Sequence, residues 1–182
     1  KTSDFLSGNA PLSLTDFDLL ETTTLTTNTS SVTFSGLGSY SEYKHLQIRW
    51  VARSQSTDNS SKRLVMQINS QVSVYNAHEL MANGAQVGSY SYSDIRPFVG
   101  WMSDNGMDAG IYGAGCIDVL DYSDSSKNTT FRILSGVTGQ NRISLASALY
   151  RATTPVSSMV FFSQDFAGFM AGTRFSIYGI KG

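Results

Sequence analysis

Residues 43–53 read YKHLQIRWVAR, a stretch in which apolar and polar side chains alternate almost residue by residue. A period of two predicts a β-strand with one face in a core and one in solvent, because successive strand side chains point to opposite faces of a sheet. The apolar set is Leu46, Ile48, Trp50 and Ala52. The polar set, expected on the opposite face, is His45, Gln47, Arg49 and Arg53.

The same alternation recurs in short pieces along the rest of the chain. It runs through residues 63–70, where Leu64, Met66 and Ile68 form the apolar set. The other apolar pairs expected in the core are Val32 and Phe34, Ile117 and Val119, Phe131 and Ile133, Ile143 and Leu145, and Phe175 and Ile177. The polar residues that separate the last four pairs, expected on the opposite face, are Asp118, Arg132, Ser144 and Ser176.

Segments rich in turn-forming residues separate these predicted strands. They are residues 57–61, 104–110, 121–128, 136–141 and 166–172. No long segment has a helical apolar stripe, and the best helical candidate, residues 77–82, fits a strand equally well. Many short strands with little or no helix are typical of an antiparallel β-sandwich of jelly-roll-like topology, with a closed barrel as the alternative.

The length of 182 residues fits a single domain. Residues 1–16 have no sustained apolar period, and we expect them to be an N-terminal arm or linker before a sandwich domain at 17–182. Residues 22–31 are rich in Ser and Thr and are a candidate edge strand. Because the sequence starts at Lys1 rather than Met, we expect it to be trimmed, processed or cut from a longer parent chain.

The composition argues against several classes of protein. With a formal net charge of −1 and a pI near 6.1, the chain has no basic field that would attract nucleic acid. No apolar run is long enough to span a membrane, so no membrane partner is expected. The single cysteine, Cys116, excludes an intrachain disulfide and a cysteine-based zinc site, and we expect it to be a small buried side chain.

Few residues of the chain suggest catalysis. His45 lies on the polar face of the clearest strand, and His78 should point away from its neighbour Glu79 if both are in a strand. The carboxylates Asp118, Asp121 and Asp124 fit a strand that ends in an Asp-Ser turn better than a calcium loop. We therefore expect no enzyme activity, no catalytic residue, no metal and no cofactor. A hydrolase with two converging carboxylates remains as a reserve hypothesis.

Aromatic residues supply the one candidate binding site. Sugar rings stack on exposed aromatic side chains, and Tyr90, Tyr92 and Trp101 are the best placed in the sequence. Asp94 and Arg96 lie between them and could bind sugar hydroxyl groups. These five residues are the candidate glycan-binding set, although the same aromatics could equally pack in the core or against another subunit.

Two stretches resemble a known family: residues 43–49, YKHLQIR, and residues 172–182, GTRFSIYGIKG. Together with residues 19–21, LLE, and 117–122, IDVLDY, they resemble a β-sandwich domain of virion proteins of tailed bacteriophages, especially marine and cyanobacterial ones. The likeness spans about residues 15–182. These motifs have the alternating pattern of β-strands and contain no catalytic centre.

The resemblance implies a structural protein on the exterior of a virion, as a capsid decoration protein, a head fibre or a tail-fibre tip. Its expected partners are other virion proteins and copies of itself, with a trimer favoured. A nearly neutral surface rich in Ser, Thr, Asn and Gly agrees with this, since it can dock on copies of itself without burying unpaired charges. The alternative is a carbohydrate-binding module that recognises a host surface glycan.

Overall fold

The computed structural model describes residues 16–93 and 96–182, and these form strands joined by turns, with two 3-10 turns at Leu37–Ser39 and Thr138–Gln140. The first six strands are β1 (Phe17–Thr24), β2 (Ser31–Ser35), β3 (His45–Ser54), β4 (Lys62–Ile68), β5 (Tyr75–Ala82) and β6 (Val87–Ser93). The others are β7 (Phe98–Asp104), β8 (Gly113–Leu120), β9 (Thr129–Val137), β10 (Arg142–Tyr150), β11 (Ser158–Ser163) and β12 (Arg174–Ile180).

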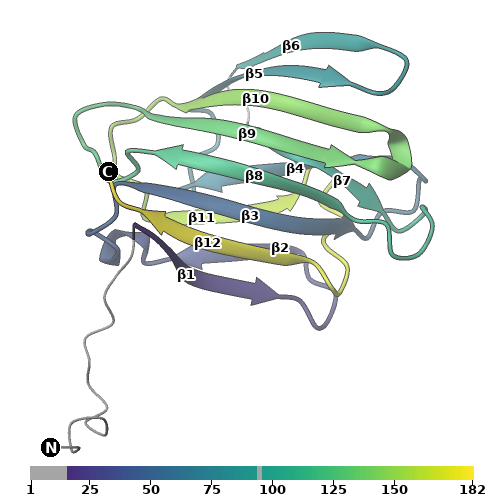
Figure 1. Ribbon diagram of the computed structural model, residues 1–182, viewed down its shortest axis with the longest axis horizontal. Helices are drawn as coiled ribbons and strands as arrows, with labels where there is room; N and C mark the ends of the chain where they lie inside the picture. The colour runs from purple at the N-terminus through teal and green to yellow at the C-terminus, as the bar shows by residue number, and fades with distance from the viewer. Residues whose placement is uncertain (1–15, 94–95) are drawn as a thin grey trace, which may run out of the picture.

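The strands form two layers (Figure 1). The larger sheet has the order β1-β12-β3-β8-β9-β10-β5-β6, and the smaller sheet behind it has the order β2-β11-β4-β7. All pairings are antiparallel except a short parallel contact between β3 and β7, which joins the two layers. The expected antiparallel sandwich with little helix is confirmed, and the described strands do not close into a barrel.

The core lies between the two sheets. The apolar set of residues 43–53 is buried as predicted, with each side chain at most 2% exposed. The rings of Phe161 and Phe175, one from each sheet, stack across the core with centroids 4.8 Å apart. The other predicted core residues that the structure buries are Val32, Phe34, Leu64, Met66, Ile68, Ile117, Val119, Phe131, Ile133 and Ile177.

The prediction for β10 is wrong. Ile143 and Leu145 are 57% and 52% exposed, whereas Ser144 is 1% exposed. The physical reason is a buried hydroxyl pair: Ser144 Oγ lies 3.0 Å from Oγ of Ser135, which in turn accepts a hydrogen bond from the backbone N–H of Trp101. The inward positions of β10 are therefore small or polar at this end, and its large apolar side chains point away from the core.

Two further side chains differ from expectation. Arg53 is buried rather than solvated, because its guanidinium donates to the carbonyl groups of Met107 and Asp108 in the loop after β7. Cys116 is half-buried on the side of β8 that faces away from the core, and partial burial raises the pKa of its thiol. Residues 1–15 of the expected arm lie outside the described part of the chain; β1 begins at Phe17.

Candidate functional site

The outer face of the larger sheet, which points away from the smaller sheet, carries an exposed apolar patch. The patch consists of Leu80, Leu134, Ile143 and Leu145, each between 51% and 57% exposed. Leu80 is directly opposite Leu145 across β5 and β10, and Leu145 is directly opposite Leu134 across β10 and β9. These leucines therefore form a row across three neighbouring strands, with Ile143 beside it.

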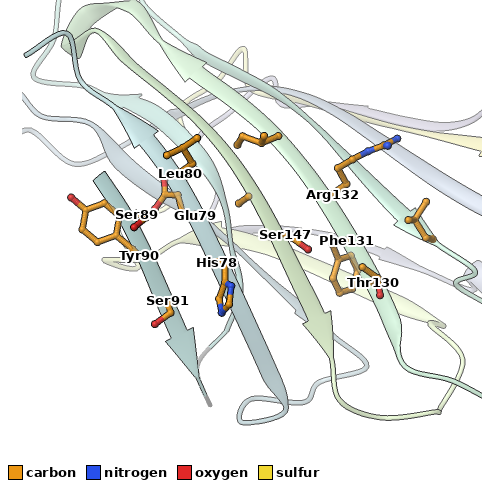
Figure 2. Close-up of a pocket in the computed structure, with 13 residues that line it drawn as sticks. His78, Glu79, Leu80, Ser89, Tyr90, Ser91, Thr130, Phe131, Arg132 and Ser147 are labelled. Carbon is orange, nitrogen blue, oxygen red and sulfur yellow. The ribbon is translucent and has the colours of Figure 1, made fainter. Parts of the chain in front are cut away.

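The outer face is hollowed beside this row. A groove of about 730 Å³ runs over β5, β6, β9 and β10, and Leu80 and Leu145 are among the residues that line it. Figure 2 shows His78, Ser147 and Arg132 along the same groove, on successive strands, with Tyr90 on the edge strand β6. A second hollow of about 690 Å³ adjoins the patch on the other side of Leu134.

A row of polar residues accompanies the leucines. Cross-strand pairing places Ser91 opposite His78, His78 opposite Ser147, and Ser147 opposite Arg132. Arg132 in turn forms an ion pair with Asp118, with Nη2 and Oδ2 2.8 Å apart. This row offers hydrogen-bond donors and acceptors at the surface. The neighbouring row of leucines can contribute only apolar area to a contact.

The structure does not bring the four described residues of the predicted glycan-binding set together on one exposed surface. Tyr90 is 45% exposed, Tyr92 is half-buried, and Trp101 is only 6% exposed, so its ring is not open to a sugar. Arg96 lies over the ring of Phe162, 5.2 Å from its centroid. Asp94 lies outside the described residues.

Trp101 instead belongs to a buried polar cluster that the sequence did not reveal. Its indole N–H donates to Glu79 Oε1 at 2.8 Å, and the Tyr92 hydroxyl donates to Glu79 Oε2 at 3.1 Å. Two guanidinium groups lie over the Trp101 ring, that of Arg142 at 4.1 Å and that of Arg63 at 5.2 Å from the centroid. Burial of Tyr92 raises the pKa of its hydroxyl.

His78 and Glu79 point to opposite faces of β5, as predicted: His78 is exposed on the outer face, and Glu79 is buried. The only signal in the sequence for the Glu79 cluster is a carboxylate at an inward position of an alternating strand. Nothing in the spacing of residues 79, 92 and 101 indicates that they meet, because contacts between strands depend on the register of the sheet.

The acidic segment after β8 forms local contacts. Asp124 Oδ1 accepts hydrogen bonds from the backbone N–H and the hydroxyl of Ser126, which confirms the expected Asp-Ser turn. Lys127 pairs with Asp121 at 2.5 Å, and this hydrogen bond lowers the pKa of the Asp121 carboxyl below its usual range. Across residues 16–93 and 96–182, no three side chains of His, Cys, Asp and Glu gather to hold a metal ion.

Comparisons with known proteins are sparse. No protein-family model matches the chain, and no curated protein matches it. One solved structure that resembles it is the marine PL-14 alginate lyase from Aplysia kurodai, at a TM-score of 0.32 and 8% sequence identity over 77% of this chain and 69% of that chain. A likeness this weak transfers neither fold nor activity. In the described part of the chain, no helix has the length and apolarity to cross a membrane.

Proposed function

We propose that this chain is a non-enzymatic structural protein of a bacteriophage virion, displayed on the particle exterior as a capsid decoration, head-fibre or tail-fibre domain. It acts by assembly with copies of itself and with other virion proteins. The virion assignment is supported by the resemblance carried by residues 43–49 and 172–182. The assembly assignment is supported by the apolar patch on the outer face.

The apolar patch is the observation that carries the proposal. Scattered exposed apolar residues are normal, but a contiguous group rimmed by polar residues marks a site of protein contact. Burial of the exposed halves of these four side chains would contribute about 3–6 kcal/mol, at about 1.5–3 kcal/mol for a whole Leu or Ile side chain. That gain is similar to the lower estimates of the cost of association, about 4 kcal/mol, so a lasting complex needs further contacts.

The assembly proposal is tested with the full chain and the double variant L134S/L145S. Loss of two exposed leucines from the contact is expected to weaken self-association at least about tenfold, since about 1.4 kcal/mol corresponds to a factor of ten. Sedimentation velocity over a concentration series measures the effect. The matched control is Leu19→Ser, which removes an equally exposed leucine from β1, far along the sheet from the patch.

Two outcomes would contradict the assembly proposal. One is a wild-type chain that remains monomeric at every concentration, and the other is a double variant that associates as tightly as the wild type. Thermal unfolding of each variant shows that the fold is unchanged. Immunogold labelling of intact particles of the encoding virus tests the virion assignment, which fails if only disrupted particles are labelled or none are.

A second candidate function is recognition of a host surface glycan, and it rests on the groove rather than on Trp101. His78, Ser147 and Arg132 offer polar groups along the groove, whereas Tyr90 pairs with the inward Glu79, so its ring lies on the other face of β6. Binding of the wild-type chain to an array of bacterial surface glycans, lost in Ser147→Ala and in His78→Ala but kept in Leu19→Ser, would support this function. Equal binding by all the variants would exclude the groove.

A further inference from the structure

Among residues 16–93 and 96–182, β6 is an open edge of the larger sheet, paired with β5 on one side only (Figure 1). An open edge presents unpaired backbone N–H and C=O groups, and proteins usually protect such edges with charges, prolines, bulges or short strands. The opposite edge, β1, carries Asp18 and Glu21 and is interrupted by a bulge between Leu19 and Glu21. In the smaller sheet the edge strand β2 has only five residues.

β6 has none of these protective features. Its seven residues read VGSYSYS, with no charge and no proline, and they pair with β5 in an unbroken register from Val87 to Ser93. We propose that β6 of one copy pairs antiparallel with β6 of a second copy about a two-fold axis at Tyr90, so that the two larger sheets become one continuous sheet. This inference rests on the proposed assembly function and adds a contact at the sheet edge to the one at the outer-face patch.

The backbone geometry limits the registers open to such a pair, and an axis at Tyr90 is one that it allows. At the turn between β5 and β6, the N–H of Asn83 donates to the carbonyl of Gln86 at 3.1 Å. Hydrogen-bonded and non-hydrogen-bonded pairs alternate in an antiparallel ladder, so Val87, Ser89, Ser91 and Ser93 direct their backbone groups away from β5. A two-fold axis at Tyr90 places Ser89 opposite Ser91 of the second copy and Val87 opposite Ser93, so these backbone groups face one another.

The side chains of β6 are complementary to themselves in this register. Residues 89–91 read Ser-Tyr-Ser in both directions, which is what an antiparallel pair of identical strands requires at its centre. Tyr90 of each copy would meet its counterpart in a non-hydrogen-bonded pair, where side chains come closest. The Tyr90 ring already lies over Gly88, where an added Cβ would be 2.8 Å from the hydroxyl oxygen.

Charge does not oppose pairing with a second copy. A two-fold axis places identical side chains near each other, so a charged edge would repel itself, whereas the neutral β6 does not. The axis is perpendicular to the sheet, so the outer faces of both copies lie on the same side. Leu80, one strand in from the edge, and its counterpart then belong to one larger apolar surface. The pairing makes a dimer, not the trimer expected from the sequence.

Two double variants of the full chain test the register. S89K/S91K places lysine opposite lysine at two positions across the seam and is expected to weaken dimerisation at least tenfold in sedimentation equilibrium. S89K/S91E has the same number of new charges but places opposite charges across the seam, so it is expected to dimerise at least as tightly as the wild type at low salt. Equal dimerisation of both variants and the wild type would overturn the proposal, as would equal weakness of both variants.

A disulfide provides a second test of the same axis. In a Cys116→Ser background, Tyr90→Cys places two thiols in a non-hydrogen-bonded pair, whose Cα separation of about 4.5 Å suits a disulfide. Mild oxidation is expected to give a cross-linked dimer. Val87→Cys in the same background is the matched control, because Val87 is also exposed on β6 but lies opposite Ser93. Equal cross-linking by both variants, or none by Tyr90→Cys, would overturn the register.

These tests separate failure of the inference from failure of the assembly proposal. If L134S/L145S dissociates the oligomer and S89K/S91K does not, the chain assembles through its outer face and the β6 contact is wrong. If the wild-type chain is monomeric throughout, both proposals fail. If the wild-type chain stays monomeric yet an added extended peptide protects the β6 amides from hydrogen exchange, the partner is a foreign strand and the second copy is excluded.

Discussion

Replacement of Glu79 by alanine is expected to destabilise the fold by about 2–4 kcal/mol. The substitution leaves the buried indole N–H of Trp101 without its acceptor, and an unsatisfied buried donor costs about 1–3 kcal/mol. It also removes a buried methylene group, which adds about 0.8 kcal/mol. Loss of the acceptor for the Tyr92 hydroxyl adds less, because Tyr92 is only half-buried and water can accept from its hydroxyl.

The assay is urea-induced unfolding followed by tryptophan fluorescence, because Trp101 itself reports on the cluster. For a chain of this size, a loss of about 3 kcal/mol corresponds to a fall of roughly 6–12 °C in the unfolding temperature. Glu79→Gln keeps an acceptor for the indole N–H and is expected to lose about 1 kcal/mol. Glu42→Ala, at an exposed glutamate, is the control and is expected to leave stability unchanged.

The reasoning is refuted if Glu79→Ala loses less than about 0.5 kcal/mol. Such a result would mean that the cost of burying the carboxyl group cancels what its two hydrogen bonds contribute. The glycan hypothesis implies that Trp101→Ala would leave thermal stability little changed, and the burial of Trp101 contradicts that expectation. Trp101→Ala is not a neutral probe of sugar binding, since loss of a buried Trp costs about 3–5 kcal/mol.

Three further predictions concern stability. Ile133→Ala is expected to cost about 2–5 kcal/mol and Ile143→Ala less than about 1 kcal/mol in denaturant unfolding, because only Ile133 is buried. Gly115→Ala is expected to cost about 1–3 kcal/mol in the same measurement, since an added Cβ would lie 2.5 Å from the Trp50 indole. The pKa of the Asp121 carboxyl is below its usual value of 3.8. The charged carboxylate therefore stabilises the fold above pH 3.8, and this stabilisation is lost as the pH falls through the lowered pKa. The difference in unfolding temperature between the wild type and Asp121→Asn should accordingly shrink in acid.

Alternation predicts a strand wherever the polar and apolar sets are well separated. Residues 43–53 meet this condition, and the structure buries Leu46, Ile48, Trp50 and Ala52. The same local rule fails at residues 143–145, where the apolar side chains are outside and Ser144 is inside. Alternation indicates that neighbouring side chains point to opposite faces of the strand. It does not indicate which face meets the core, because that depends on the sheet that covers the strand.

The contacts of the candidate site could be predicted from the sequence even less well than the buried faces of the strands. The sequence correctly predicted that His78 and Glu79 point to opposite faces of one strand, since this follows from strand geometry alone. It could not indicate that Trp101 is buried against Glu79, or that Leu80, Leu145 and Leu134 form one row, because these residues come from strands that are distant in the chain. Such contacts depend on strand order and register.

By itself, the sequence determined that the chain forms short strands with one apolar face, because the two-residue period and the turn residues act within a few positions of each other. Only the tertiary structure decided which strands lie at the edges, which apolar faces remain uncovered, and where the aromatic side chains are placed. Those features depend on pairing between segments far apart in the chain, where free energy is gained only once the two sheets have met.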